Sequence, residues 1–316
     1  MKTGATDDGA RVVSVNISTE KGVSKRPVAE IIIDEQGVVG DGHAGAPLRN
    51  VSLLAVESIE RFAKEAGREF QCGDFAENIT TRGIDIPHLA LLDRLTIGPV
   101  ELEVTQIGKV CHGDGCAIFR EVGQCVMPKE GIFCRALRGG PVRAGDAVTL
   151  APKRLKCLVI TLSDRAHRGL YADQSGPRAK ALIEAHFAQR PWQADVEMLL
   201  LPDDAALLRE ALECARDAET DAVITTGGTG IGPRDITPDV VTALADKTIP
   251  GIMEHIRLKF GAEKPNALLS RSVAAVLGRT LVYTLPGSVR AVNEYLGEIL
   301  ASLEHAVRML HGLDAH

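Results

Sequence analysis

The chain has few aromatic residues, at 3% of 316 positions, so its cores must be built from aliphatic side chains. It also has no surplus of basic residues: 36 Lys and Arg face 42 Asp and Glu, for a net charge of −6. A nucleic-acid-binding protein normally carries a basic face, so we expect no nucleic-acid partner. Anionic small ligands are not excluded, because backbone N–H groups can bind phosphate in an acidic protein.

No stretch approaches the roughly 20 apolar residues that a membrane span needs, so no membrane partner is predicted. The first 13 residues, MKTGATDDGARVV, contain no apolar core, and we expect no signal peptide. The seven cysteines are odd in number and widely spread, which argues against a disulfide framework. A reducing compartment, and hence a cytoplasmic protein, is the expectation.

The first half is rich in short β-branched runs and glycines. Strands are predicted at 12–17, 28–33, 95–97 and 100–104, and a final hairpin at 139–150. One helix is predicted at 56–63, where apolar residues have helical spacing. This pattern favours a mainly-β domain with a barrel-like or strongly bent sheet.

The polar segment 151–154 is the predicted boundary, with domains at 1–152 and 153–316. Beyond it, apolar strand patterns alternate with helical ones. Strands are expected at 157–162, 196–201, 222–226 and 281–285, and helices at 179–187, 205–215 and 289–310. Alternation of this kind predicts a three-layer α/β domain with a mostly parallel sheet. Ligands bind such sheets at the carboxyl ends of the strands.

A glycine-rich loop follows one of these strands. Its residues are Thr226, Gly227, Gly228, Thr229 and Gly230. Taken alone, this loop is equally compatible with a tight turn and with a backbone phosphate cradle. The next segment is Arg234-Asp235-Ile236-Thr237-Pro238, in which Thr237 is the predicted N-cap of a helix and Pro238 its first residue. Asp235 is then a candidate Mg²⁺ ligand beside a phosphate, or a helix cap.

Acidic and hydroxyl residues follow two other predicted strands. Asp203 ends one of them, either facing the same crevice as Asp235 or, like Asp204, only capping the next helix. Ser163 and Asp164 end the first strand of the domain. If the sheet is parallel, these groups converge on one edge.

The second half resembles the MogA/MoaB-like molybdopterin adenylyltransferase family. The matching pieces are Ser163-Asp164-Arg165, Pro202-Asp203, Gly227-Gly228-Thr229-Gly230, Arg234-Asp235-Ile236-Thr237-Pro238, Leu269-Ser270-Arg271-Ser272 and Leu285-Pro286-Gly287. The resemblance implies adenylylation of molybdopterin by ATP with Mg²⁺, and a homotrimer. It implies that Asp203 and Asp235 are the catalytic acids and metal ligands. The implied ligand-binding residues are Ser163, Asp164, Thr226, Gly227, Gly228, Thr229, Gly230, Arg234, Ser270, Arg271, Pro286 and Gly287.

One departure from the family pattern is Ser288-Val289 after Pro286-Gly287, where the family often has a second proline just after Pro-Gly-x. Two alternatives to catalysis therefore stay open. The chain could be a molybdopterin or molybdenum cofactor carrier without turnover, or a generic nucleotide-binding α/β protein.

In the first half, Cys111 and His112 precede Cys116, Cys125 and Cys134. The spacing lacks the paired C-x-x-C of structural zinc sites. A reactive or sulfur-carrying thiolate at Cys111 fits better, since Lys109 and His112 favour the charged form. Buried hydrophobic roles are a competing interpretation for Cys125 and Cys134.

This half resembles the MOSC domain of molybdenum cofactor sulfurases over residues 10–150. The resemblance rests on Gly37–Gly45, Arg49–Leu53, Gly73–Ile79 and the Cys111 region. It implies a β-barrel-type fold, binding of molybdenum cofactor or its sulfur, and a catalytic role for Cys111. His43 is either a ligand contact or a residue that stabilises its turn. The two resemblances together predict a bifunctional protein of cofactor assembly, with other assembly proteins as further partners.

Overall fold

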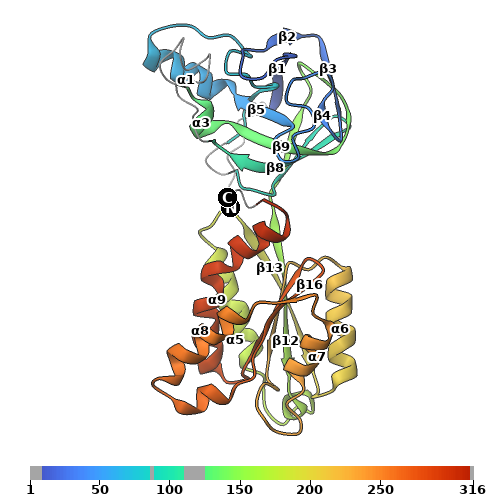
Figure 1. The fold of residues 1–316 in the computed structure, drawn as a ribbon, viewed down its shortest axis with the longest axis vertical. Coiled ribbons are helices and arrows are strands. Elements are labelled where there is room, and N and C mark those ends of the chain that lie inside the picture. The colour runs from blue at the N-terminus through green and yellow to red at the C-terminus, as the bar shows by residue number, and fades with distance from the viewer. Residues whose placement is uncertain (1–8, 86–88, 110–124, 314–316) are drawn as a thin grey trace. The chain divides into compact units, whose positions relative to one another are not determined.

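The structure is a computed structural model that describes residues 9–85, 89–109 and 125–313. The chain divides into two units, Met1–Lys153 and Arg154–His316 (Figure 1). The predicted Cys111–Cys116 site lies outside the described residues.

The N-terminal unit consists mainly of β-strands. An eight-stranded sheet has the order β11-β7-β8-β9-β5-β6-β1-β2, and a three-stranded sheet has the order β10-β3-β4. The strands are β1 (Arg11–Ile17), β2 (Arg26–Val28), β3 (Glu30–Asp34), β4 (Gly37–Val38), β5 (Val51–Ala55), β6 (Ile79–Arg82), β7 (Arg94–Ile97), β8 (Val100–Ile107), β9 (Ile132–Arg138), β10 (Gly140–Arg143) and β11 (Val148–Ala151). Two helices accompany them, α1 (Val56–Ala66) and α3 (Met127–Glu130). Only β5 and β6 pair in parallel among the described strands of this unit.

The predicted hairpin at 139–150 is wrong. β10 pairs with β3, whereas β11 pairs with β7 in the other sheet. The turn with Gly145 between β10 and β11 is therefore where the chain crosses from one sheet to the other. Within the described residues, β11 and β2 are the two edges of the larger sheet, so a closed barrel stays a prediction.

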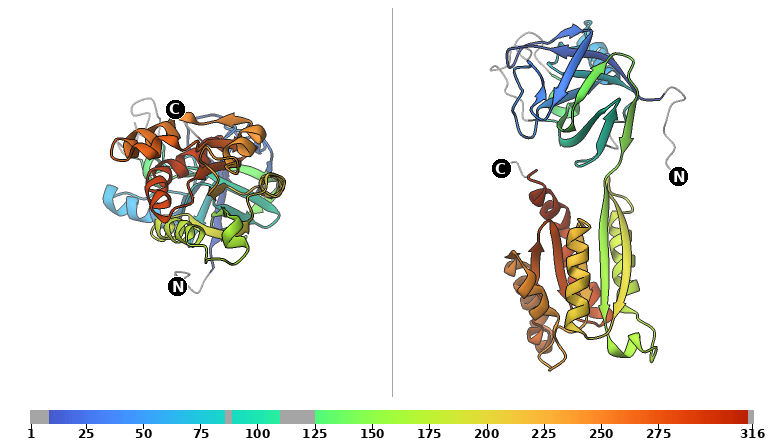
Figure 2. Two further views of the ribbon diagram at one scale, coloured as in Figure 1. Left: turned by 90° about the horizontal axis from the view of Figure 1, so that it is seen from below. Right: turned by 90° about the vertical axis from the view of Figure 1, so that its right-hand side faces the viewer.

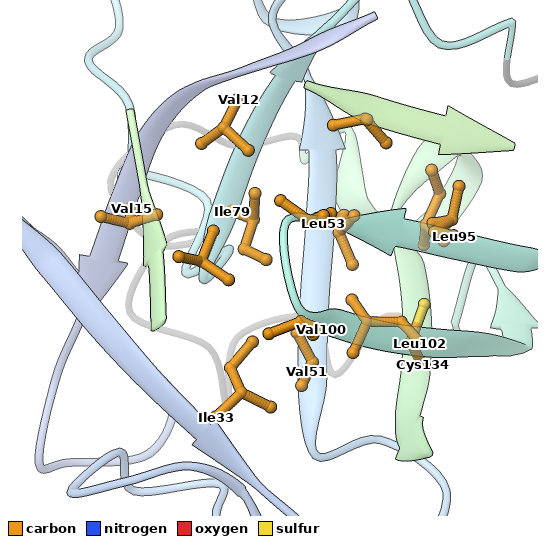
Figure 3. Packing of buried hydrophobic residues seen from close by; sticks show 14 of the residues in the cluster. Val12, Val15, Ile33, Val51, Leu53, Ile79, Leu95, Val100, Leu102 and Cys134 are labelled. Carbon is orange, nitrogen blue, oxygen red and sulfur yellow. The ribbon is translucent and has the colours of Figure 1, made fainter. Parts of the chain in front are cut away.

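The core of this unit is aliphatic, as the scarcity of aromatic residues requires. Side chains from strands far apart in sequence meet there, among them Val15, Leu53, Ile79, Leu95 and Leu102 (Figure 3). Each is completely buried. Burial of such a side chain contributes about 1.5–3 kcal/mol, so the shared core holds the two sheets together.

The C-terminal unit is a six-stranded, mostly parallel sheet of order β13-β12-β14-β17-β16-β15. Its strands are β12 (Arg154–Leu162), β13 (Gln193–Leu201), β14 (Ala222–Thr226), β15 (Lys247–Thr248), β16 (Ala274–Leu277) and β17 (Thr280–Leu285). The first four strands of the order are parallel, and β16 is antiparallel to β17. The long neighbouring strands β12 and β13 are visible in the right-hand view of Figure 2.

Helices cover both faces of this sheet, which confirms the predicted three-layer α/β class. They are α4 (Asp164–His167), α5 (Ser175–Phe187), α6 (Ala205–Asp217), α7 (Thr237–Leu244), α8 (Pro250–Gly261) and α9 (Val289–Leu310), with a 3-10 turn at Pro265–Leu269. α5, α8 and α9 pack on one face, and α6 and α7 on the other (Figure 1). The apolar stripe of α9 buries Val292, Leu296, Ile299 and Leu303, because residues three and four apart share one helix face.

Sequence reasoning missed β16, β15 and α8. The strand β16 is a short four-residue hairpin partner of β17, and a run of that length has no periodicity to mark it. In the part of the chain that the structure describes, no helix combines the length and hydrophobicity needed to cross a membrane.

Candidate functional site

The glycine loop begins where β14 ends at the carboxyl edge of the sheet. Gly227 has a φ of +100°, and a Cβ there would lie 2.4 Å from the carbonyl oxygen of Leu162. Gly228 has a φ of +63°, and its Cβ would lie 2.5 Å from the hydroxyl of Thr237. Both positions therefore require glycine, since side chains disfavour this φ and have no room.

Thr237 is not the helix N-cap that the sequence predicted. It is the first residue of α7, and its hydroxyl donates to the carbonyl of Gly227 at 3.0 Å. Its amide donates to the carbonyl of Gly228 at 3.1 Å. The side chain thus fastens the glycine loop to the helix, because the loop curls back within its reach.

The ends of β12 and β13 are joined by a pair of aspartates. The amide N–H of Asp164 donates to Oδ2 of Asp203, and the amide N–H of Asp203 donates to Oδ1 of Asp164, both at 3.2 Å. Asp204, not Asp203, caps α6, accepting from the amides of Ala206 and Leu207 at 2.8 and 3.0 Å. Asp203 therefore does not cap the helix, and whether it faces the same crevice as Asp235 stays a prediction.

Arg234 places a positive charge beside one of these carboxylates. Its guanidinium lies 3.5 Å from Oδ2 of Asp164, and its side chain is 76% exposed. It belongs to the segment after the glycine loop, so the contact connects that segment to the end of β12.

The neighbouring Asp235 turns toward its own loop. Its Oδ2 accepts from the amide of Gly232 at 2.8 Å, and Gly230 passes so close that a Cβ there would lie 2.8 Å from the same oxygen. Among the described residues Asp235 and Asp203 share no hydrogen-bond partner, so the predicted pairing of these two as metal ligands stays a prediction.

Arg271 has a structural role in this geometry. It donates to the carbonyl of Gly230 at 2.7 Å and to that of Asp235, and it forms a bidentate pair with Asp239 at 2.8 and 3.0 Å. Arg271 therefore stabilises the conformation of the segment from the glycine loop to the start of α7. Ser270 shares a 2.8 Å hydrogen bond with the hydroxyl of Ser272.

A cavity of about 310 Å³ opens between the carboxyl ends of β12 and β14. The amino-terminal ends of α5 and α9 border it. Its lining includes the hydroxyl residues Thr161, Ser163, Tyr171, Ser175, Thr226 and Ser288, together with Asp173 and Gly287. Helix N-termini and hydroxyls at such an edge are the groups that bind phosphate oxygens.

Hydrogen bonds hold the lining of the cavity in place. The hydroxyls of Ser175 and Thr226 lie 2.9 Å apart, and Thr161 donates to Oδ2 of Asp173 at 2.7 Å. The hydroxyls of Ser163 and Tyr171 lie 2.8 Å apart. Six of the lining side chains are therefore paired, and their orientation is set before a ligand binds.

The structure brings together some predicted site residues and separates others. Ser163, Thr226 and Gly287 line the cavity. A Cβ on Gly287 would lie 3.3 Å from the Cα of Gly227, so the Pro286-Gly287 turn packs against the glycine loop. Gly228, Thr229, Gly230, Ser270 and Arg271 are not among the lining residues described for the cavity.

Sequence reasoning missed Tyr171, Asp173, Ser175 and Ser288. The segment 168–174 has no periodic pattern, so only its fold over the strand end reveals it. Ser288 does carry a signal, since it is the N-cap of α9 and accepts from the amide of Ala291 at 3.2 Å.

A metal ion could bind at this edge of the sheet only if phosphate oxygens supplied some of its ligands. No group of three or more potential ligand side chains occurs in the ranges 9–85, 89–109 and 125–313. Mg²⁺ needs only one or two carboxylates when phosphates complete its shell, and Asp203 offers such an oxygen at this edge.

The N-terminal unit contains a buried polar cluster around Asp41, in which a hydrogen bond from Asn78 joins two of the segments behind the MOSC resemblance. Lys25 Nζ lies 2.6 Å from Oδ2 of Asp41, with both side chains 1% exposed. Asn78 donates its side-chain amide to the same oxygen at 2.9 Å, and His43 lies beside Oδ1 at 3.3 Å. Burial would raise the pKa of Asp41, but hydrogen bonds from His43 and Lys25 outweigh it and hold that pKa well below its usual range.

Glu77 lies in the same buried region. Its Oε1 accepts from the amide of Gly73 at 2.6 Å and from the hydroxyl of Thr80 at 2.8 Å. Burial raises the pKa of this carboxyl above its ordinary value. The Gly37–Gly45 and Gly73–Ile79 segments are thus held by one polar network.

Fold and site together define a three-layer α/β domain with a hydroxyl-lined cavity at the carboxyl edge of a mostly parallel sheet. A family model described as the probable molybdopterin binding domain matches residues 158–305, and a model of the MOSC domain matches residues 40–149. The chain belongs to the molybdopterin-binding family, and its N-terminal half contains a MOSC domain, which confirms both resemblances.

Curated relatives align with about half of the chain. A molybdopterin adenylyltransferase from Haemophilus influenzae is 36% identical over 143 residues, which are 45% of this chain and 71% of that protein. Gephyrin from Dictyostelium discoideum is 34% identical over 159 residues, 48% of this chain but only 22% of gephyrin's length. A solved structure of MogA is 35% identical, covering 50% of this chain and 99% of its own, with a TM-score of 0.46.

Proposed function

We propose that this chain acts in molybdenum cofactor biosynthesis and that its C-terminal unit adenylylates molybdopterin with Mg²⁺ and ATP. The observation that carries the proposal is the hydroxyl-lined cavity at the ends of β12 and β14, beside the Asp164–Asp203 pair. The names of the adenylyltransferase relatives support the same activity.

In this reaction the terminal phosphate of molybdopterin attacks the α-phosphorus of ATP. A new P–O bond forms, the bond between the α- and β-phosphates breaks, and pyrophosphate leaves. Bound Mg²⁺ would neutralise charge on the phosphates, held by Asp203 and Asp235. The protein's main task is positioning, since phosphoryl-type transfer needs no covalent nucleophile.

The residues of the chain have separate tasks in this proposal. Phosphate oxygens in the cavity are held by Thr226, Ser175 and Ser163. Gly227 has no side chain, so the substrate can approach the backbone closely there. Arg234 is exposed enough to reach a phosphate oxygen. Ser270 and Arg271 would contact the pterin from the far side of the glycine loop.

The test is incubation of the full chain with molybdopterin, ATP and Mg²⁺. We expect adenylylated molybdopterin and pyrophosphate in equal amounts, and a loss of at least 100-fold for Asp203→Ala or Asp235→Ala. Absence of product from wild-type protein would overturn the proposal. Tight molybdopterin binding without turnover would indicate a carrier, and ATP binding without pterin binding would indicate a generic nucleotide-binding protein.

For the N-terminal unit we infer binding or modification of molybdenum cofactor or its sulfur, with Cys111 as the reacting group. Support comes from the MOSC match and from the polar network around Asp41. Cys111→Ser should abolish retention of cofactor or persulfide sulfur, measured on the purified protein. Retention at the wild-type level would refute the role of this cysteine. The family resemblance further predicts a trimer, which solution mass tests.

A further inference from the structure

The reciprocal hydrogen bonds between Asp164 and Asp203 constrain both carboxylates. Each side chain accepts the other's backbone amide at 3.2 Å, so neither can rotate without leaving an amide of a strand end unpaired. The arrangement uses Oδ2 of Asp203 and leaves its Oδ1 without a hydrogen bond in the described part of the chain. The free oxygen of Asp203 therefore has a set direction before substrates bind.

Two carboxylates this close repel each other unless a cation is near. Arg234 meets this need, because its guanidinium lies 3.5 Å from the second oxygen of Asp164. Asp164 thus has two separable functions: Oδ1 accepts a hydrogen bond that orients Asp203, and Oδ2 faces a positive charge. A hydrogen bond that fixes a carboxylate matters for catalysis, since a misplacement of about 1 Å at a reacting centre can cost roughly 100-fold in rate.

We propose that Asp164 is a positioning residue for adenylyl transfer and that it acts through Asp203, by accepting the Asp203 amide. The inference rests on the proposed function of the C-terminal unit. The proposed role of Asp164 is to orient the Asp203 carboxylate through a hydrogen bond, and this role does not require the negative charge of Asp164.

Two substitutions of Asp164 distinguish the hydrogen bond from the charge. Asp164→Asn keeps an oxygen acceptor at the same distance and removes the charge, so its kcat should stay within about fivefold of wild type. Asp164→Glu keeps the charge but moves the acceptor by one methylene, so kcat should fall by about 100-fold. KM for ATP should change less than threefold in the glutamate variant, because the cavity that holds phosphate is unaltered.

Asp204→Ala is the matched control. It removes the N-cap of α6, which costs about 1 kcal/mol of stability, without touching the Asp164–Asp203 pair. Its thermal midpoint should fall while kcat stays within twofold of wild type. If Asp204→Ala and Asp164→Glu lose activity alike, general destabilisation explains the effect and the inference is overturned.

The combined variant Asp164→Glu with Asp203→Ala tests whether the first residue acts through the second. We expect it to be no slower than Asp203→Ala alone, since coupled residues are not additive. Multiplied losses would overturn the inference, as would a kcat of Asp164→Glu equal to wild type. An asparagine variant as slow as the glutamate variant would show that the retained hydrogen-bond acceptor does not suffice and would also overturn the inference. An inactive wild-type protein would instead overturn the proposed function, and the inference with it.

Discussion

Replacement of Gly227 by alanine tests whether the glycine loop depends on close packing. The new Cβ would lie 2.4 Å from the Leu162 carbonyl oxygen, whereas ordinary contact begins near 3.4 Å. The ends of β14 and β12 must then separate by about 1 Å. Overpacking of this kind costs about 1–3 kcal/mol, and the positive φ adds about 1–2 kcal/mol for a residue with a Cβ.

We therefore expect Gly227→Ala to lose about 3 kcal/mol, which lowers the thermal midpoint of a unit of this size by about 6–12 °C. The same displacement of the strand end should reduce adenylyl transfer by about 100-fold. Calorimetry of the full chain and the pyrophosphate assay measure the two effects.

Gly297→Ala is the control for this prediction. Gly297 is in the middle of α9, and a Cβ there meets nothing within 4 Å. Alanine should stabilise the helix by about 0.5–1 kcal/mol and leave the activity unchanged. If Gly227→Ala behaves like Gly297→Ala, the strand ends tolerate a side chain and the reasoning is refuted.

Three further predictions concern the N-terminal unit. Glu77→Gln should gain stability relative to wild type as the pH rises from 5 to 8. The pKa of Glu77 is raised in the folded protein, so folding favours its protonated form, and wild-type stability is lost as the pH rises through the folded pKa. Thermal midpoints of both proteins at several pH values measure this difference. Lys25→Met should cost about 3–5 kcal/mol in urea unfolding, because it leaves the Asp41 carboxylate buried without its cation. Under native conditions a thiol reagent should label Cys111 and spare Cys134, which is completely buried and whose pKa is raised by burial.

Each of these predictions has an outcome that contradicts it. A pH-independent difference between Glu77→Gln and wild type would mean that Glu77 does not titrate differently on folding. The control for Lys25→Met is Arg154→Met, which breaks an exposed ion pair with Asp195. Equal urea midpoints for these two variants would contradict the argument that burial makes the Lys25–Asp41 pair costly to break. Labelling of Cys125 in place of Cys111 would show that the reactive thiol was assigned to the wrong cysteine.

Much of the C-terminal fold could be predicted because its signals are local. The apolar spacing of α9 and the buried run of β14 are readable from short windows. The alternation of these elements then indicates a parallel sheet, and a parallel sheet places its strand ends at one edge. The N-terminal unit was less predictable, because its strands pair across long sequence distances: β10 meets β3, and β11 meets β7.

By itself, the sequence determined the two-part organisation, the α/β class of the second half and the family of each half, since these depend on residue types and their order. The different roles of the neighbouring aspartates could be read only from the tertiary structure. Asp203 and Asp204 are adjacent in sequence, yet one meets Asp164 across two strands and the other caps a helix. Spacing cannot separate them, because the direction of a side chain at a strand end is set by partners that the fold brings from 39 residues away.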